Sequence, residues 1–346
     1  MKNEEIIMTE NSVSKQETEA SKKNDMILDV ENLVVRYETE DGIVRALNGV
    51  DFKLGYKKTL GLVGETGAGK TTAALAMLRL IPSPPGVMEC DKMEIDGKDM
   101  LTMEAHDLRK VRGDTISMIF QDPMTSLNPT FTVVDQIAES IELHEKVSKQ
   151  EAHEKALDML ELVGIPRTRG NEYPHQFSGG MKQRVVIAIA LACNPSLLIA
   201  DEPTTALDVT IQAQVLDLMN KLRDQYGTSL IMITHDLGIV AEICDYVAIM
   251  YAGQDVEYAD KHELFTNPLH PYTVGLFGCI PDLTIEQDEL IPIPGMMPDP
   301  TVVHKGCPFA ARCPDATDRC FNEKPPVVQV NENHRVRCFK YAEVTD

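Results

Sequence analysis

One stretch of eight residues constrains the fold of this chain more than any other feature. Residues 64–71 read GETGAGKT and match the phosphate-loop pattern GxxxxGK[ST] at every fixed position. The apolar run at 59–63 precedes the loop, and the helix-forming run at 72–78 follows it. The order strand, loop, helix predicts an α/β domain that holds a phosphate group at the start of a helix. The alternative is a glycine-rich turn with a surface lysine, which does not account for both flanks.

The residue types in this loop match the needs of a nucleoside triphosphate with its magnesium ion. Glycines let successive backbone N–H groups point inward at an anion, and the following helix adds its positive end. Lys70 is expected to contact the β- and γ-phosphates, and the hydroxyl of Thr71 is expected to bind Mg²⁺. The residues predicted to bind the nucleotide here are Gly64, Glu65, Thr66, Gly67, Ala68, Gly69, Lys70, Thr71 and Thr72.

Composition narrows the class of protein further. The 346 residues, of which 43% are hydrophobic, suffice for one large α/β domain with an appended region. The net charge of −21 argues against duplex nucleic acid as a partner, because phosphate binding needs clustered Lys and Arg. No apolar run is long enough to span a bilayer and the first residues lack a signal-peptide core, so we expect a cytosolic chain. In that compartment the eight cysteines are expected to be reduced or bound to metal.

The chain before the phosphate loop divides into a tail and a predicted sheet. Residues 1–25 are polar and charged, and we expect them to form a mobile tail. Two β-prone runs, 27–35 and 43–54, flank a turn at 40–42 and predict a small antiparallel sheet. Tyr37 follows the first run and is placed either to stack on an adenine ring or to pack, and the sequence leaves both open.

Beyond the first helix, another predicted strand ends at a polar residue. Residues 114–120 alternate apolar and polar positions and lead to Gln121. The amide oxygen of Gln121 is placed to contact the magnesium ion or the attacking water, and an ordinary turn residue is the alternative. Residues 131–163 have apolar positions at helical spacing, which predicts a helical insertion.

A second glycine-rich turn repeats the chemistry of the first. The run FSGGM at 177–181 directly precedes a predicted helix at 182–193, with Ser178, Gly179 and Gly180 at its centre. A small hydroxyl residue and glycines before a helix favour anion binding. Because this turn lies far along the chain from the first loop, we expect it to contact the nucleotide of a second copy or of a partner. A glycine-rich helix cap without a ligand is the alternative.

Two carboxylates and a histidine follow further apolar runs. The run 197–200 predicts a central parallel strand that ends at Asp201 and Glu202, and the run 230–233 predicts another that ends near His235. Asp201 is predicted to hold Mg²⁺, and Glu202 is predicted to accept a proton from the water that attacks the γ-phosphate. His235 is predicted to donate to the γ-phosphate, with a hydrogen-bonded loop histidine as the alternative.

These motifs, in this order over residues 26–260, resemble those of the nucleotide-binding subunits of ATP-binding-cassette (ABC) transporters. The resemblance implies a P-loop NTPase fold with a mixed central sheet, an antiparallel N-terminal subdomain and a helical subdomain at about 122–190. A small Cys/Pro-rich extension follows at 261–346. The family's commonest signature is LSGGQ, and this chain departs from it at Phe177 and Met181.

The resemblance also implies a role for each motif residue. It assigns adenine stacking to Tyr37, Mg²⁺ binding to Thr71, Gln121 and Asp201, catalysis to Gln121, Glu202 and His235, and contacts across an ATPase dimer to Ser178, Gly179, Gly180 and Asp208. ATP is the nucleotide that the family uses. The site is therefore expected to be built by two subunits.

Three longer runs are similar to the ATPases of oligopeptide and dipeptide importers. They are FQDPMTSLNP at 120–129, YPHQFSGGMKQR at 173–184 and DEPTTALDVTIQAQV at 201–215. The resemblance implies an ATPase that powers peptide import, as the first of two ATPase subunits beneath two permease subunits at the cytoplasmic face of the membrane. An extracytoplasmic peptide-binding protein feeds such a complex. The alternative is a soluble ABC-family ATPase of assembly, repair or translation, but those usually carry a long coiled coil or two cassettes.

The last part of the chain is rich in proline and contains half of its cysteines. Their spacing differs from the CxxC pairs of zinc ribbons, and disulfides are not expected in the cytosol. The resemblance to peptide-importer ATPases implies a [4Fe–4S] cluster, and zinc or free thiols are the alternatives. The four predicted ligands are Cys307, Cys313, Cys320 and Cys338.

Overall fold

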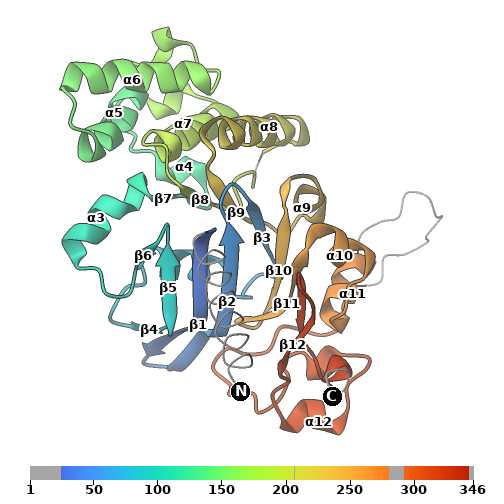
Figure 1. Ribbon diagram of the computed structural model, residues 1–346. Helices are drawn as coiled ribbons and strands as arrows, with labels where there is room; N and C mark the ends of the chain where they lie inside the picture. The colour runs from blue at the N-terminus through green and yellow to red at the C-terminus, as the bar shows by residue number, and fades with distance from the viewer. Residues whose placement is uncertain (1–24, 206, 280–291, 343–346) are drawn as a thin grey trace, which may run out of the picture.

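The computed structural model describes residues 25–205, 207–279 and 292–342. The tail predicted at 1–25 lies outside them except for Asp25. Two sheets form the body of the molecule, a group of helices lies at one end, and the C-terminal strands lie toward the other (Figure 1).

The smaller sheet is antiparallel and comes from the N-terminal part of the chain. β1 (Met26–Thr39) pairs along most of its length with β2 (Gly42–Gly55), and the residues between them form the predicted turn. β5 (Lys92–Ile95) and β6 (Lys98–Asp99) extend the sheet in the order β2-β1-β5-β6, and β4 (Gly86–Glu89) also pairs with β1. Buried side chains of β1 and β2 share one core with the helix that follows the phosphate loop.

The larger sheet is mixed, with eight strands in the order β12-β13-β11-β10-β3-β9-β8-β7. Strands β10, β3, β9, β8 and β7 are parallel, and the remaining pairings are antiparallel. Strands β3, β8 and β9 are buried at every position, which is why their sequences read as apolar runs. The bounds are β3 (Thr59–Val63), β7 (Ile116–Ile119), β8 (Leu197–Asp201), β9 (Ser229–Ile233), β10 (Tyr246–Tyr251), β11 (Gln254–Asp260), β12 (Val327–Asn331) and β13 (His334–Arg337).

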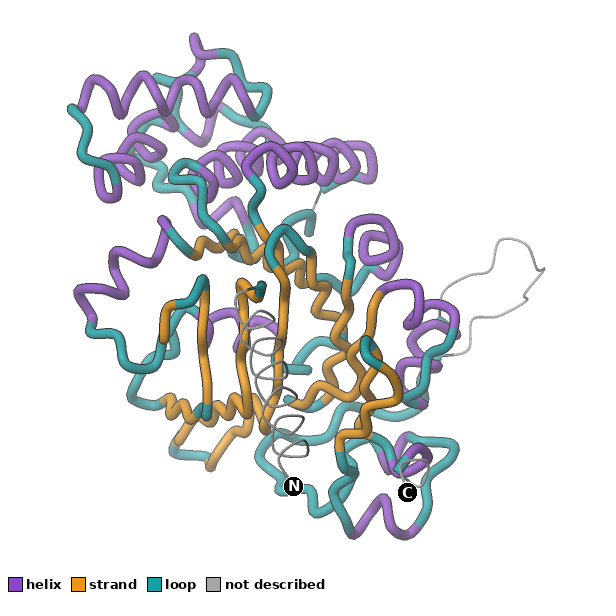
Figure 2. The backbone as a smooth tube through the Cα atoms, in the orientation of Figure 1, coloured by secondary structure: helices purple, strands orange, loops and turns teal. Residues whose placement is uncertain are grey.

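Some of the helices form a separate group at one end of the molecule. Helices α5, α6 and α7 gather at the end of the molecule away from the C-terminal strands (Figure 2). The α-helices are α2 (Lys70–Met77), α3 (Ala105–Asp114), α4 (Pro123–Ser126), α5 (Val133–His144), α6 (Lys149–Leu162), α7 (Gly179–Leu191), α8 (Val209–Tyr226), α9 (Leu237–Ile243), α10 (Lys261–Thr266), α11 (Pro271–Gly278) and α12 (Asp318–Asn322).

Capping residues explain where the helices of this group begin. Thr132 caps α5 and Ser148 caps α6, so the insertion predicted at 131–163 is a pair of helices. The helix predicted at 182–193 begins earlier, at Gly179, because the Ser178 hydroxyl accepts a hydrogen bond from a first-turn backbone N–H.

The C-terminal strands complete the edge of the larger sheet. β13 pairs with β11, and its residues Arg335 and Arg337 lie 3.2 Å and 3.1 Å from the buried carboxylate of Asp255. At the start of β13, the Nε2 atom of His334 lies 2.8 Å from an oxygen of Glu257, and both side chains are fully buried. Ion pairs and strand pairing therefore fasten the Cys/Pro-rich region to the sheet that carries the phosphate loop.

Candidate functional site

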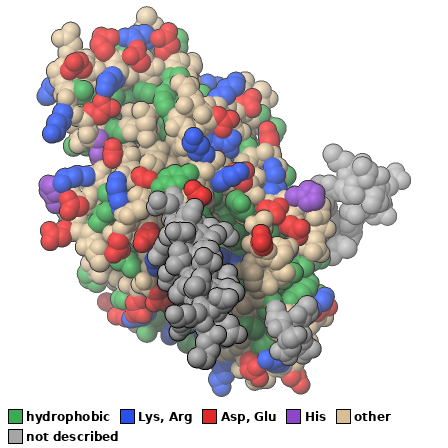
Figure 3. Space-filling model, viewed as in Figure 1, with side chains coloured by type: hydrophobic (Ala, Val, Ile, Leu, Met, Phe, Trp, Pro, Cys, Tyr) green, Lys and Arg blue, Asp and Glu red, His purple; other side chains and the backbone are tan. Residues whose placement is uncertain are grey.

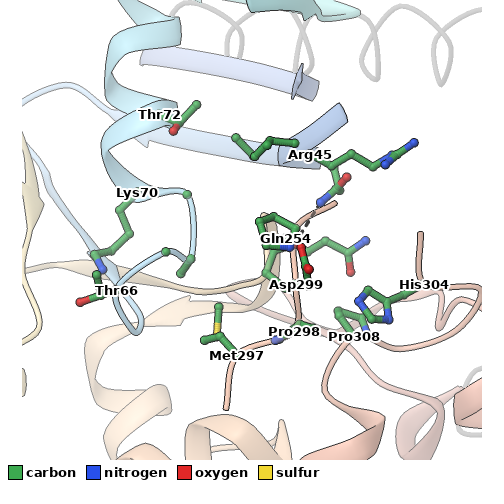
Figure 4. A pocket seen from close by; sticks show the side chains of 18 of the residues that line it. Arg45, Thr66, Lys70, Thr72, Gln254, Met297, Pro298, Asp299, His304 and Pro308 are labelled. Atoms are coloured by element: carbon green, nitrogen blue, oxygen red, sulfur yellow. Dashed lines mark hydrogen bonds between the residues drawn. The ribbon is translucent and has the colours of Figure 1, made fainter. Parts of the chain in front are cut away.

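A cavity of about 910 Å³ lies beside the phosphate loop, and most of the predicted nucleotide residues meet there. Figure 4 shows Thr66, Lys70 and Thr72 on one side and C-terminal residues such as Met297 and His304 on the opposite side. The predicted site residues that line the cavity are Tyr37, Thr66, Gly67, Ala68, Gly69, Lys70, Thr71, Thr72, Gln121, Glu202 and His235. Motifs from distant parts of the chain are thus brought to one place.

Close packing fixes the path of the phosphate loop. An added Cβ at Gly69, whose φ is 100°, would lie 2.6 Å from the carbonyl oxygen of Ala46 on β2. An added Cβ at Gly64 would lie 2.2 Å from the carbonyl oxygen of Met250 on β10. Only glycine allows the loop to lie this close to both strands. The loop amides are therefore held in position before any ligand arrives.

Lys70 is buried within its own loop. Its Nζ atom donates to the carbonyl oxygens of Gly64 at 2.7 Å and Glu65 at 3.1 Å. Burial lowers the pKa of Lys70, and the nearby carboxylates Glu202 and Asp201 oppose that shift. The carbonyl oxygens satisfy the ammonium group, and phosphate oxygens can replace them as acceptors.

The three predicted catalytic side chains lie in hydrogen-bond contact. Glu202 accepts from Gln121 Nε2 at 3.1 Å and from the Thr205 hydroxyl at 3.0 Å, and its other oxygen lies 3.3 Å from His235 Nδ1. Burial raises the pKa of Glu202, but the bonds from Thr205 and His235 outweigh it, and the net pKa is below the usual value. Glu202 has a φ of 46°, a conformation that costs free energy in a non-glycine residue. The carboxylate is therefore ionised at neutral pH and aimed by its neighbours.

Asp201 differs from Glu202 because its carboxylate is buried, with the Thr71 hydroxyl beside it. Its side chain is 1% exposed, and neither oxygen has a hydrogen-bond partner within the described residues. Burial raises the pKa of Asp201, and the neighbouring Thr71 and Lys70 oppose part of the shift. An unpaired buried carboxylate beside a hydroxyl is a donor set that fits Mg²⁺, which prefers oxygen ligands.

The residues of the second glycine-rich turn do not line this cavity. Ser178 caps α7, and Asp208 caps α8 by accepting from the N–H of Ile211 at 2.9 Å. An added Cβ at Gly180 would lie 2.6 Å from the side chain of Ile211, so the two caps are neighbours. Gly179 lies nearest Leu207. The predicted contacts of Ser178, Gly179, Gly180 and Asp208 with a nucleotide stay predictions.

The sequence motifs missed the far wall of the cavity. The segment 297–304 from the C-terminal region lines it, and Arg45 of β2 anchors that segment. The Arg45 N–H donates to Pro300 O at 2.9 Å, and the guanidinium donates to Thr301 O at 3.1 Å. Backbone carbonyls make these contacts, so no residue pattern in the sequence signals them.

The four C-terminal cysteines also meet, in a separate cavity of about 400 Å³. All four line it as free thiols, and the Cys307 N–H donates to Cys320 O at 2.7 Å. Burial raises the pKa of Cys307 to about 11, with a further contribution from the other three cysteines. In the described part of the chain, no three His, Cys, Asp or Glu side chains are grouped closely enough to hold one metal ion.

Two further features concern the surface charge and the length of the helices. Basic and acidic side chains are interspersed on the face shown in Figure 3. None of the helices among the described residues has the length and apolar character needed to cross a bilayer.

Comparison with known proteins defines the class of this cassette. Residues 47–205 match the ABC transporter family, and residues 256–320 match the family described as the C-terminal region of oligopeptide/dipeptide transporters. A solved dimeric ATP-binding cassette, in a post-hydrolysis state with ADP and Pi, has a TM-score of 0.60 at 26% identity, covering 68% of this chain and 98% of its own. CbiO1 of Clostridium perfringens, part of an ABC transporter complex, has a TM-score of 0.60 at 28% identity, covering 70% and 92%. The chain is a P-loop NTPase of the ABC type, and the predicted fold class is confirmed.

Relatives narrow the class further. The oligopeptide transport ATP-binding protein OppD of Bacillus subtilis is 50% identical over 316 residues, which are 90% of this chain and 88% of that protein. OppD of Escherichia coli is 46% identical over 326 residues, or 94% and 96%. A probable peptide ABC transporter ATP-binding protein of Sinorhizobium fredii is 47% identical over 331 residues, or 95% and 99%. This chain belongs to the family of oligopeptide transport ATP-binding proteins.

Proposed function

We propose that this chain binds and hydrolyses ATP and thereby powers peptide import through a membrane ABC transporter. The observation that carries the proposal is the one cavity in which Lys70, Gln121, Glu202 and His235 lie together with the phosphate loop. The names of the relatives support a peptide as the cargo. They disfavour the alternative of a soluble ABC-family ATPase without a membrane partner.

The geometry divides the work of hydrolysis among named residues. The loop amides and Lys70 bind the β- and γ-phosphates, with Lys70 exchanging its carbonyl acceptors for phosphate oxygens. Thr71, Gln121 and Asp201 would hold Mg²⁺, which neutralises charge on the phosphates when bound. Glu202 polarises the attacking water, and His235 holds the Glu202 carboxylate in place.

A second ATPase subunit completes each site in this proposal. Ser178 and Gly180 lie away from their own chain's cavity, which supports a role at the nucleotide of the facing subunit. The complex then comprises two ATPase subunits, either different or identical, two permease subunits and an extracytoplasmic peptide-binding protein. The ATPase lies on the cytoplasmic face of the membrane as a peripheral subunit.

The test is peptide uptake by the membrane complex reconstituted in vesicles with MgATP. The complex that contains the wild-type chain should hydrolyse ATP and accumulate peptide, and Lys70→Ala should abolish both. Lys58→Ala is the matched control, because the Lys58 side chain makes an exposed ion pair with Asp245 and does not line the cavity. If the chain purifies from cells as a soluble particle without permeases, the importer proposal is wrong and the alternative is favoured.

The four-cysteine cavity is the second part of the proposal, with a [4Fe–4S] cluster as its occupant and zinc as the alternative. Zinc needs four sulfur atoms within about 2.3 Å of one point, whereas a cubane cluster accepts more widely separated thiolates. The observation that supports a metal site here is that four thiols line one cavity of about 400 Å³.

Anaerobically prepared protein should then be brown and contain about four irons per chain. Replacing any one of Cys307, Cys313, Cys320 and Cys338 by Ser should bleach the colour. Cys90→Ser is the control, since Cys90 lies outside the cavity and hydrogen-bonds backbone carbonyls. Protein that contains stoichiometric zinc would contradict the cluster and favour zinc. Protein without any metal would contradict both assignments.

A further inference from the structure

The phosphate loop is held from outside by a residue of the C-terminal region. Arg312 donates from Nη1 to Glu65 Oε2 at 2.9 Å and from Nη2 to Glu65 Oε1 at 3.0 Å. The two parallel bonds join a guanidinium to a carboxylate in the paired geometry that gives the strongest contacts of this kind. The side chain of Arg312 is 7% exposed and that of Glu65 is 28% exposed, so water screens the pair weakly.

Arg312 is itself fixed by its surroundings. Its Nε atom donates to Pro294 O at 2.9 Å, and its remaining N–H groups reach Ile293 O and the Tyr251 hydroxyl, each at 3.3 Å. Together with the bonds to Glu65, these contacts use all five guanidinium donors. The guanidinium carbon also lies 5.7 Å from the centroid of the Tyr251 ring. Arg312 is therefore a rigid support and not a mobile surface charge.

Glu65 in turn connects this support to the phosphate-binding groups. Its backbone N–H donates to the Tyr272 hydroxyl at 3.0 Å. Its carbonyl oxygen accepts from Lys70 Nζ at 3.1 Å and from the Ala68 N–H at 3.1 Å. A displacement of Glu65 therefore moves an acceptor of the phosphate lysine and an amide of the loop.

The aromatic side chains behind the pair are equally well packed. Tyr272 and Tyr251 are fully buried, with ring centroids 4.6 Å apart, and Phe309 contacts both rings. Phe309 and Arg312 belong to the short segment between Cys307 and Cys313. The C-terminal region thus reaches the phosphate loop through one contiguous, buried set of contacts.

We propose that Arg312 is a positioning residue of the ATP site, which holds the phosphate loop in its binding conformation through Glu65. The inference rests on the proposed function, because it requires that the loop bind the phosphates of ATP. In this proposal the C-terminal region contributes to the nucleotide site through a residue 247 positions along the chain from Glu65.

The test uses the full-length chain and measures MgATP affinity together with the KM and kcat of ATP hydrolysis. Arg312→Ala should weaken MgATP affinity and raise KM by about tenfold, a change that corresponds to the loss of one charge-assisted pair. The kcat should change less, because Glu202 and His235 stay in place. Arg312→Lys keeps the charge but not the paired geometry, and it should give an intermediate loss.

Glu65→Gln removes the same contact from the loop side. It should reproduce the loss, and the double variant should be no worse than the worse single variant. Adenosine, which lacks phosphate, should bind all variants equally. Glu323→Gln is the matched control, since Glu323 makes an exposed ion pair with Arg319 in the same region and should leave MgATP affinity unchanged.

Two outcomes overturn parts of the argument and are distinguishable. If Arg312→Ala and Glu65→Gln lower the thermal unfolding temperature but retain wild-type MgATP affinity and KM, Arg312 only docks the C-terminal region and the positioning role is wrong. If Arg312→Ala does not fold, Glu65→Gln alone decides the question. If Lys70→Ala also binds MgATP normally, the proposed function of the loop is wrong as well.

Discussion

The phosphate loop (64–71) and the signature turn (177–181) have similar local chemistry and different surroundings. Each is a glycine-rich turn at the start of an α-helix, where backbone N–H groups lack helical partners. The helix after the phosphate loop has no side-chain cap, whereas Ser178 caps the helix after the signature turn. The first turn faces a cavity with carboxylates, and the second turn does not line that cavity.

The support of the two turns differs as well. Two strands, the Tyr272 hydroxyl and the Arg312 guanidinium hold the phosphate loop. The nearest neighbours of the signature glycines are Leu207 and Ile211, beside the cap of α8. A glycine-rich turn becomes a binding site through the groups that face it and the groups that hold it. For the phosphate loop, its own chain supplies the facing groups and the holding groups. For the signature turn, we expect a facing subunit to supply them.

The largest expected effect tests the chemistry that only the phosphate loop faces. Glu202→Gln should slow hydrolysis at least about a hundredfold, because general-base help to the attacking water is lost. ATP binding should persist. Single-turnover hydrolysis measures the rate of the chemical step, and a separate affinity measurement reports ATP binding. Glu323→Gln, in an exposed ion pair with Arg319, is the control and should hydrolyse ATP normally. Near-normal turnover in Glu202→Gln would show that Glu202 is not the catalytic base. The phosphate loop would then not differ from the signature turn by facing this carboxylate.

The next effect tests whether the signature turn works on another subunit. Ser178→Ala should lower hydrolysis by the dimer by about a hundredfold, the usual loss on removing one group that contacts developing charge. ATP affinity of the isolated chain should be unchanged. Thr132→Ala removes an equivalent cap from α5, about 1 kcal/mol of stability, without touching either turn and should hydrolyse normally. A loss of affinity in isolated Ser178→Ala would place the signature at its own chain's nucleotide.

A smaller effect comes from the unpaired carboxylate beside the phosphate loop. Burial raises the pKa of Asp201, so the folded state favours the protonated form and the ionised form costs stability at neutral pH. Asp201→Asn should therefore raise the melting temperature of nucleotide-free protein by roughly 3 °C at pH 7. The gain should disappear as the pH falls toward the ordinary pKa of aspartate, and stabilisation by MgATP should be lost. Equal melting temperatures at pH 7 would mean that Asp201 has a partner in solution.

The smallest effect concerns β12 and β13, the strands that attach the C-terminal region to the larger sheet. Burial lowers the pKa of His334, but Glu257 and Glu263 outweigh it, and the net pKa is above the ordinary value. The folded state therefore binds the proton more tightly, and this contribution is complete below the ordinary pKa of about 6.5 and is lost as pH rises through the raised pKa. The protection factors of amides in β12 and β13, which correct for the intrinsic rise of amide exchange with pH, should fall over that range, while those of the signature turn should stay constant. Glu257→Gln should flatten the pH dependence, and a pH-independent wild type would contradict the pairing.

Sequence spacing predicted the local parts of the site well. The apolar runs before Gly64, Gln121, Asp201 and the loop of His235 are the strands β3, β7, β8 and β9. Neighbouring parallel strands end at the same edge of a sheet. The residues that follow these strands therefore lie close together. The helical insertion and the antiparallel sheet also follow from periodicity and turn residues that act over a few positions.

Short-range spacing and glycine geometry specified the phosphate loop with its strand and helix, and the resemblance of the ordered motifs to ABC ATPases implied the fold class. Three features depend on the tertiary structure: Arg312 holds Glu65, the segment 297–304 lines one wall of the cavity, and four cysteines with irregular spacing share another cavity. Such contacts join distant residues through backbone carbonyls, single ion pairs and packed rings, which impose no period on the sequence. Forming these contacts costs the entropy of closing long loops. Their stability comes from packing that exists only when the whole chain has folded.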